Sequence, residues 1–388
     1  MTRHAITNRS DEILAGTREF VPPALDVIGQ ENSEPVVDWR VAMKLAIRSS
    51  HELRQHLALS PPNEEPRGGI CREVSDPSLD LSTEPVQIAA EKDFPTFVPL
   101  EYVQRIRRGD PRDPLLLQVM PVPEEDKEVA GFVSDPVGDL KVMPASGVLH
   151  KYHGRALVVT TGACGIHCRY CFRREFPYSE NSTMGRLSET VLDFLQQHQE
   201  VEEVLLSGGD PLTLVDERLK GIIDDISSFA HVKRLRIHSR MPIVIPQRVT
   251  SELIELLRQS RLATWFVVHV NHPQELDADV LEHLGRLIDA GIPVLNQAVL
   301  LRGVNDRVDV LEALCRKLIN HRIQPYYLHQ LDRVHGAAHF EVCEQRGLEL
   351  VESLRSRLPG YAVPEYVVER SGETSKTPII AGQTFASI

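Results

Sequence analysis

From about residue 140 onward, short apolar runs alternate with longer segments that have the periodicity of amphipathic helices. Six apolar runs predict β-strands, over residues 156–161, 203–207, 234–238, 265–270, 293–298 and 324–328. The segments after them predict helices over residues 188–198, 217–228, 251–259, 273–290, 308–320 and 342–358. Alternating strands and helices form parallel sheets with right-handed crossovers, so we expect an α/β fold with a partial (β/α)6, TIM-like barrel. Periodicity alone leaves open whether this barrel closes.

The first 140 residues have a weaker pattern. Helical periodicity is present over residues 38–59 and again over residues 98–122. Between them lies a stretch rich in Pro, Gly and acidic residues, which is typical of a long loop. We therefore predict three parts, namely a flexible N-terminal arm over residues 1–36, a helical N-terminal region over residues 37–140 with a loop insertion near residues 60–95, and the barrel over residues 141–388.

Composition and charge exclude several classes of protein. Hydrophobic residues make up 42% of the 388 residues, which is enough to form a sizeable core and excludes global disorder. No apolar run approaches the ~20 residues that span a bilayer, and the N-terminus lacks a signal-peptide pattern, so we expect a cytoplasmic protein without membrane association. The formal net charge of −12 argues against a nucleic-acid-binding surface.

Three of the six cysteines, Cys164, Cys168 and Cys171, follow the first predicted strand within a few residues of one another. Three thiolates in one loop are typical of a soft metal centre, either an iron–sulfur cluster or zinc. The alternatives are a structural zinc site with His167 as its fourth ligand and cysteines that bind no metal. Zinc sites usually pair two cysteine knuckles, and no second knuckle is present. The cysteines expected to take no part are Cys71, Cys315 and Cys343.

The CxxxCxxC spacing at the end of the first barrel strand resembles the radical S-adenosylmethionine (radical SAM) enzymes. Other segments, within about residues 95–380, resemble the lysine 2,3-aminomutase family of these enzymes. They are Cys171-Phe172-Arg173-Arg174, Ser207-Gly208-Gly209-Asp210-Pro211-Leu212, Arg248, His269-Val270-Asn271-His272-Pro273, the stretch from Asn296-Gln297 to Asn305-Asp306, Pro325-Tyr326-Tyr327 and Ser375-Lys376-Thr377-Pro378. The resemblance implies a radical SAM barrel with a [4Fe-4S] cluster, S-adenosylmethionine and pyridoxal 5′-phosphate as cofactors.

The resemblance also assigns the cofactor-binding residues. Cys164, Cys168 and Cys171 match the family's cluster ligands. Lys376 matches the catalytic lysine that holds pyridoxal phosphate covalently, in a C-terminal segment of the barrel. The residues that match the family's S-adenosylmethionine site are Ser207, Gly208, Gly209, Asp210, His269 and Gln297. The residues that match its phosphate-binding arginines are Lys151 and Arg155, of which Lys151 lacks the bidentate guanidinium.

Three further residues match the substrate-binding positions of the family. Arg173 matches the residue that holds the α-carboxylate of the amino acid, a task suited to a planar guanidinium. Asp332 and Glu369 match two carboxylates that bind the ε-ammonium group of lysine. Two acids at one end of a pocket select a cationic side chain and repel an anionic one. Glu369 stands where longer family members have Asp, which adds a methylene group.

The resemblance implies an isomerase that converts L-lysine to (R)-β-lysine through a 5′-deoxyadenosyl radical. The short C-terminus, Glu369 and two segments resemble the family members that supply β-lysine for the modification of elongation factor P. The segments are Lys233-Arg234-Leu235-Arg236-Ile237-His238-Ser239-Arg240 and Gly336-Ala337-Ala338-His339-Phe340. This resemblance implies a functional link to an elongation factor P ligase. Arg307 replaces a zinc-ligand cysteine of the longer members, so we expect no structural zinc. The expected electron donor is a reductase, flavodoxin or ferredoxin, and the oligomeric state stays open. The alternatives are a catabolic or osmolyte-forming lysine 2,3-aminomutase, an ordinary pyridoxal-phosphate enzyme with a structural metal, and a non-catalytic metal-binding module.

Overall fold

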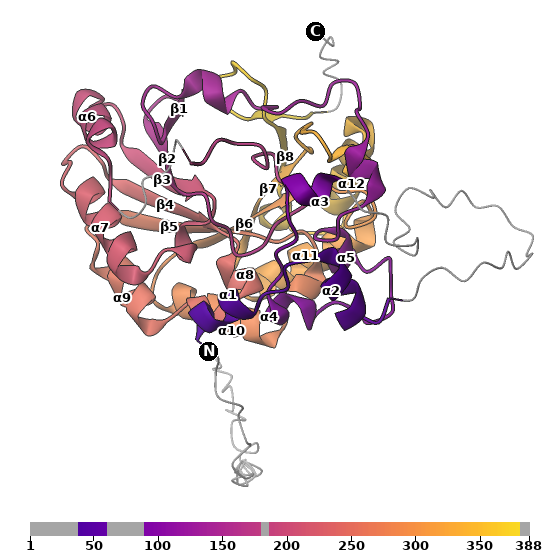
Figure 1. The fold of residues 1–388 in the computed structure, drawn as a ribbon. Coiled ribbons are helices and arrows are strands. Elements are labelled where there is room, and N and C mark those ends of the chain that lie inside the picture. Colours follow the sequence, from indigo (N-terminus) through magenta and orange to yellow (C-terminus); the bar gives the residue numbers. More distant parts are fainter. Residues whose placement is uncertain (1–37, 60–88, 180–185, 381–388) are drawn as a thin grey trace, which may run out of the picture. The chain divides into compact units, whose positions relative to one another are not determined.

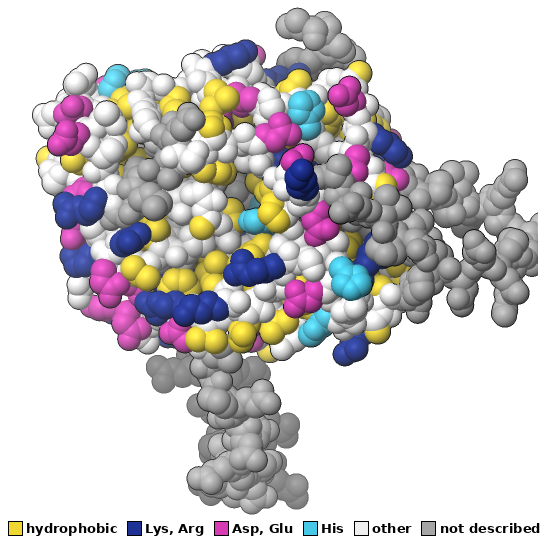
Figure 2. All heavy atoms as spheres, viewed as in Figure 1, with side chains coloured by type: hydrophobic (Ala, Val, Ile, Leu, Met, Phe, Trp, Pro, Cys, Tyr) yellow, Lys and Arg dark blue, Asp and Glu magenta, His cyan; other side chains and the backbone are white. Residues whose placement is uncertain are grey.

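The computed structural model describes residues 38–59, 89–179 and 186–380 (Figure 1). The predicted N-terminal arm, Cys71 and most of the predicted loop insertion therefore lie outside the described residues. No helix of the described part combines the length and apolar character needed to cross a membrane. On the face shown in Figure 2, basic and acidic side chains are interspersed rather than gathered into patches of one sign.

The strands of the described residues form one sheet whose spatial order follows the chain. They are β1 (Val148–Tyr152), β2 (Arg155–Thr161), β3 (Glu203–Gly208), β4 (Arg234–Ser239), β5 (Ala263–His269), β6 (Val294–Val299), β7 (Gln324–His329), β8 (Glu365–Val368) and β9 (Thr377–Pro378). Neighbours from β2 to β8 are parallel, whereas β1 and β9 pair antiparallel at the two edges. The two edges do not pair with each other in the described sheet, so the predicted partial barrel is confirmed.

The crossover helices lie around the outside of this curved sheet (Figure 1). They are α6 (Glu189–Gln197), α7 (Asp216–Ser227), α8 (Met241–Val244), α9 (Ser251–Gln259), α10 (Ala278–Asp289), α11 (Val308–Asn320) and α12 (Glu344–Arg355). The helix expected from residue 273 begins only at Ala278, because the Asp277 side chain caps it by accepting from the Val280 amide. Pro273–Glu275 instead forms a separate 3-10 turn.

In the described residues of the N-terminal region, the helices are short. They are α1 (Trp39–Leu45), α2 (Ser50–His56), α3 (Ala89–Asp93), α4 (Leu100–Val103) and α5 (Pro114–Leu117). The continuous helix expected over residues 38–59 is wrong, because Ile47 leaves the helix and exchanges two backbone hydrogen bonds with Val98, of 2.8 and 3.0 Å. The segment over residues 98–122 is likewise mostly non-helical, and α3 lies inside the predicted loop insertion. The 3-10 turns within the described ranges are η2 (Pro123–Asp126), η3 (Asp139–Val142), η4 (Pro211–Thr213), η5 (Pro246–Arg248), η6 (Pro273–Glu275), η7 (Ala338–Phe340) and η8 (Gly360–Ala362).

The alternation of side chains along each strand separates the core from the barrel interior. In β4, Leu235 and Ile237 belong to the main hydrophobic core together with helix residues such as Leu219. Arg236 and His238, at the intervening positions, line a cavity inside the barrel. In β4 the outward-facing positions are therefore apolar and the inward-facing positions are polar.

Candidate active site

The barrel interior contains a cavity of about 530 Å³. Its lining comes from the parallel strands, from β1, from the cysteine loop after β2 and from the C-terminal segment. The lining includes every site residue predicted from the sequence, namely Lys151, Arg155, Cys164, Cys168, Cys171, Arg173, Ser207, Gly208, Gly209, Asp210, His269, Gln297, Asp332, Glu369 and Lys376. Residues more than two hundred positions apart in the chain thus meet in one cavity.

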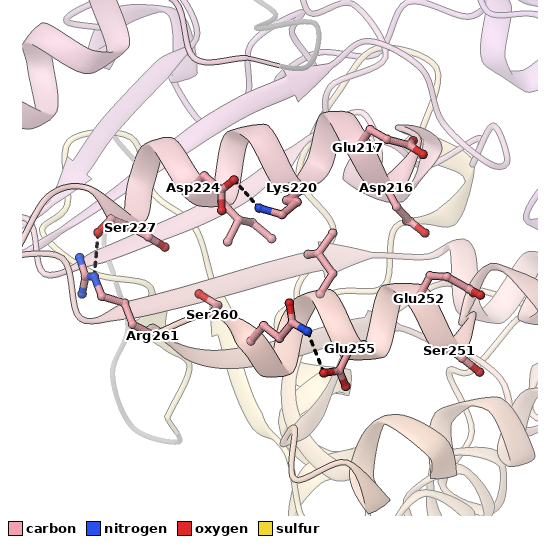
Figure 3. A pocket seen from close by; sticks show the side chains of 13 residues that line it. Asp216, Glu217, Lys220, Asp224, Ser227, Ser251, Glu252, Glu255, Ser260 and Arg261 are labelled. Carbon is pink, nitrogen blue, oxygen red and sulfur yellow. Dashed lines mark hydrogen bonds and ion pairs between the residues drawn. The ribbon is translucent and has the colours of Figure 1, made fainter.

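A second hollow, of about 650 Å³, lies outside the barrel between α7 and α9 (Figure 3). Its charged side chains are largely paired locally, as Lys220 with Asp224 at 2.6 Å, and Arg261 donates to the Ser227 carbonyl at 2.7 Å. None of the predicted site residues lines this hollow. The cavity in the barrel is therefore the candidate active site.

The three cysteines of the loop after β2 all line the cavity. Burial, with the neighbouring cysteine thiols, raises the pKa of Cys171 to about 11 and that of Cys164 well above its usual range. A cationic centre offsets this penalty, so three crowded thiols fit a metal cluster. Among the described residues, no three His, Cys, Asp or Glu side chains converge on one point as single-ion ligands do. The thiols of a cubane cluster each bind a different iron and need no such convergence.

His167 does not join the cysteines. Its Nδ1 atom lies 2.7 Å from the Pro95 carbonyl oxygen, and its ring stacks on Phe94 with centroids 4.9 Å apart. It is also absent from the cavity lining. This geometry does not support the alternative of a zinc site with His167 as the fourth ligand.

The Gly208-Gly209 turn packs against the backbone that enters the cysteine loop. Gly208 has φ of 109°, and a Cβ atom on Gly209 would lie 2.3 Å from the Ala163 carbonyl oxygen. The Gly209 amide donates to the Thr161 carbonyl at 2.8 Å. Both glycines line the cavity, yet the close approach that requires them here is to protein backbone.

Asp210 lines the cavity but directs its carboxylate at the turn after β4. It accepts from the Ser239 hydroxyl at 2.7 Å and from the Arg240 and Met241 amides at 2.7 and 3.0 Å. Burial raises the pKa of this carboxyl, and the hydrogen bonds oppose that effect. Asp210 therefore holds the end of β3 to the start of α8 in this structure.

A buried polar network that the sequence did not predict joins the cysteine loop to β5. Arg240 donates to Cys168 Sγ at 2.7 Å and to the Tyr170 hydroxyl at 2.8 Å. The Tyr170 hydroxyl lies 2.8 Å from Nε2 of His269. Burial lowers the pKa of His269 to about 3, with Arg240 acting in the same direction, so the imidazole is neutral. Gln118, from the N-terminal region, accepts from Arg240 at 2.8 Å and thereby ties that region to the site.

A second charged network lies near the edges of the sheet. Asp139 accepts from Nε of Arg173 and from Nζ of Lys151, both at 2.7 Å. Glu369 accepts from Lys151 at 2.8 Å and from Lys376 at 2.5 Å. Sequence analysis missed Asp139, because an acid in an irregular segment carries no local signal of its contacts.

The two predicted substrate-binding acids have opposite pKa shifts. Burial and the neighbouring Glu369 raise the pKa of Asp332 to about 7. Burial also opposes ionisation of Glu369, but Lys376 and Lys151 outweigh it and lower its pKa to about 2. Of these two acids, Glu369 is therefore ionised throughout the physiological pH range, whereas Asp332 titrates near neutral pH.

Arg155 is one of the cavity-lining arginines with an unused buried donor. Its Nε atom is buried and has no hydrogen-bond partner among the described residues, and its guanidinium lies 4.8 Å from the Tyr152 ring centroid. Lys151, in contrast, directs Nζ at the Val137 carbonyl, Asp139 and Glu369, at 2.8, 2.7 and 2.8 Å. The free donor on Arg155 fits an anionic ligand such as a phosphate group.

Comparison with known proteins agrees with this site. The radical SAM superfamily model matches residues 158–314, which include the three loop cysteines. The chain is 42% identical over 311 residues to the L-lysine 2,3-aminomutase of Haemophilus influenzae, covering 78% of this chain and 92% of that protein. It is 40% identical over 329 residues to the L-lysine 2,3-aminomutase of Escherichia coli, covering 82% and 96%. For the enzyme of the same name from Clostridium subterminale, the identity is 36% over 344 residues, covering 88% and 78%.

These matches extend over most of each relative and coincide with a cavity that gathers the cysteine loop, the glycine turn and Lys376. The chain belongs to the L-lysine 2,3-aminomutase family of the radical SAM superfamily.

Proposed function

We propose that this chain converts L-lysine to β-lysine, in the (R) form, with a [4Fe-4S] cluster, S-adenosylmethionine and pyridoxal phosphate as cofactors. The observation that carries the proposal is the placement of Cys168 and Lys376 in the lining of one cavity. When bound, the cofactors supply the radical and the electron-accepting ring that a 1,2-amino shift requires. The protein contributes binding, orientation and the exclusion of water.

The cations of the cavity support binding of an amino acid and a phosphate group. Arg173 donates from Nε to Asp139 at 2.7 Å and lines the cavity. A guanidinium oriented in this way can bind both oxygens of a carboxylate in bidentate fashion. Arg155 supplies an unused buried donor for the phosphate group. Lys151 is fully engaged, so we infer that it neutralises the acids around it and contacts phosphate only by releasing one of them.

Asp332 and Glu369 support selection of a cationic side chain. Both are held near Lys376, and Glu369 remains ionised throughout the physiological pH range. The carboxylates of Asp332 and Glu369 repel a negatively charged side chain in this part of the cavity, whereas they stabilise an ammonium group. We therefore infer that lysine is preferred over glutamate by the electrostatics of the pocket.

The biological role that we propose is the supply of β-lysine for modification of elongation factor P, through a separate ligase. The departure from the longer family members at Glu369 supports this role, as do the segments over residues 233–240 and 336–340, which resemble the members linked to elongation factor P. A reductase, flavodoxin or ferredoxin in the cytoplasm would deliver the electron. The second candidate is a catabolic or osmolyte-forming lysine 2,3-aminomutase. A neighbouring gene for an elongation factor P ligase favours the first role, and neighbouring lysine-fermentation genes favour the second.

The test of the proposed activity is anaerobic reconstitution of the full chain with iron, sulfide, pyridoxal phosphate and S-adenosylmethionine. Lysine and other amino acids are then supplied separately, and the products are separated by chiral chromatography. We expect (R)-β-lysine from L-lysine alone. Conversion of a different amino acid by a protein that leaves lysine unchanged contradicts the assignment. Activity in air without S-adenosylmethionine instead supports an ordinary pyridoxal-phosphate enzyme.

A further inference from the structure

Arg240 lies directly after β4 and reaches a predicted cluster ligand. One terminal nitrogen, Nη1, donates to Cys168 Sγ at 2.7 Å and to the Tyr170 hydroxyl at 2.8 Å. The Arg240 side chain is only 8% exposed. A buried guanidinium therefore contacts one of the three sulfur atoms that bind the cluster, in surroundings where water screens the charge poorly.

The second terminal nitrogen of Arg240 meets a buried acid. Nη2 donates to Oε2 of Glu275 at 2.8 Å, and the Glu275 side chain is 0% exposed. The other oxygen of Glu275 accepts from the amides of Asn271 and His272, at 2.9 and 3.0 Å. These backbone contacts fix the acid, so Arg240 lies between a fixed carboxylate and a cluster sulfur.

Both members of this pair are charged. An arginine guanidinium stays protonated in proteins, and Arg240 is paired with Glu275 at 2.8 Å. Burial raises the pKa of Glu275, and the adjacent Arg240 outweighs it. The pair therefore places opposite charges on one line of contacts, with the positive member against the sulfur.

Reduction adds one electron to the cluster and makes it more negative. An N–H group donated to a ligand sulfur and a nearby positive charge both stabilise the reduced form, whereas a nearby negative charge destabilises it. We propose that Arg240 and Glu275 are positioning residues that shift the reduction potential of the cluster in opposite directions. Arg240 raises the potential and Glu275 lowers it. A bound cluster would then accept an electron from an external reductant at a potential that depends on this pair.

The test is a redox titration of the reconstituted full chain, in which the electron paramagnetic resonance signal of the reduced cluster is measured at each potential. We expect Arg240→Gln to shift the midpoint potential to more negative values, and Glu275→Gln to shift it to more positive values. The double variant Arg240→Gln/Glu275→Gln should lie between the two single variants. Opposite signs are decisive, because structural loosening of the site gives no reason for them.

A matched control is available in Arg248, which is also a buried arginine but, unlike Arg240, does not line the cavity. It is 0% exposed and donates to Asp216 at 2.7 Å and to the Leu212 carbonyl at 2.7 Å. Arg248→Gln removes a buried positive charge of the same kind, so we expect it to lower stability and leave the midpoint potential unchanged. A shift in this control equal to that of Arg240→Gln would overturn the proposal.

The proposal also fails if both single variants shift the potential in the same direction or leave it at the wild-type value. If Arg240→Gln does not fold, Glu275→Gln decides alone, and an unchanged or more negative potential contradicts the proposal. Arg240→Lys, which retains the charge, should then lie nearer to wild type. The titration uses neither lysine nor pyridoxal phosphate, so its result is independent of whether the proposed substrate is correct.

Discussion

Lys376 and Glu369 form an ion pair of 2.5 Å, and Lys151 binds the second oxygen of the same carboxylate at 2.8 Å. Lys151 lies on β1, and Lys376 directly precedes β9, which are the two edge strands of the open sheet. Glu369 thus connects by side-chain contacts two edges that no backbone pairing joins in the described sheet. We infer that the proposed cofactor lysine is held in place by charge at the opening of the barrel.

The first prediction concerns Lys376→Ala. The variant should bind no pyridoxal phosphate covalently and should make no β-lysine, because the attaching amine is gone. The cluster should be retained, since Lys376 contacts Glu369 and none of the cysteines. Visible absorbance of the bound cofactor and the iron content per chain measure the two effects. Lys220→Ala, on exposed α7, is the control, and turnover of Lys376→Ala at the wild-type rate removes Lys376 from the mechanism.

The second prediction concerns pH. Asp332 has a pKa of about 7, so it is neutral below this value and negative above it. Binding of an ammonium group requires the carboxylate form, so kcat/KM for lysine should fall as pH decreases below 7, by about tenfold per unit in the limit. Asp332→Asn should lower kcat/KM and abolish this dependence. A wild-type profile of kcat/KM that is flat from about pH 5.5 to about pH 8, a range that includes the pKa of Asp332, contradicts the role of Asp332.

The third prediction concerns Asp139, which orients Arg173 through Nε at 2.7 Å. Asp139→Asn retains the shape of the side chain and removes its charge. Loss of a buried charged hydrogen bond amounts to roughly 1.5–3 kcal/mol, so we expect lysine to bind about 10-fold to 100-fold more weakly. The measurement is the change in absorbance of bound pyridoxal phosphate as lysine is added. Asp309→Asn, at an exposed ion pair, is the control, and equal affinity in both variants refutes the assignment.

The fourth prediction compares two glycines. A Cβ atom at Gly209 would lie 2.3 Å from the Ala163 carbonyl oxygen, whereas one at Gly285 in α10 meets nothing within 4 Å. Gly209→Ala should therefore destabilise the fold by ~1–3 kcal/mol through overpacking. Gly285→Ala should stabilise it by ~0.5–1 kcal/mol, because alanine favours the helix. Thermal unfolding of both variants measures these changes, and a neutral Gly209→Ala indicates that the turn relaxes.

The strands β2 to β7 could be predicted from sequence because each is an apolar run of sufficient length between turn signals. The strand β8 is only four residues long and β9 only two, so neither has a detectable period. Their place is determined by pairing with β7 and with each other. The break in the N-terminal helix at Ile47 likewise depends on a distant partner, Val98.

The site residues could be predicted where a local motif carries them, as in the cysteine loop and the turn at Gly208. Asp139, Arg240 and Glu275 could not, because their importance lies in contacts between segments far apart in the chain. Arg240 contacts Glu275 and Cys168, which lie on other segments of the chain, only in the assembled fold. Arg240 lies two residues after a predicted strand, and a charge at the end of a barrel strand is a signal that could have indicated it.

The most direct test of the account is product formation by Cys168→Ala, Lys376→Ala and the wild-type chain under the same anaerobic reconstitution. The wild-type chain should convert L-lysine to β-lysine only when S-adenosylmethionine and pyridoxal phosphate are both present. Cys168→Ala should lose bound iron and Lys376→Ala should lose bound pyridoxal phosphate, and neither should form product. β-Lysine formed by either variant at the wild-type rate, or none formed by the fully reconstituted wild-type chain, contradicts the account.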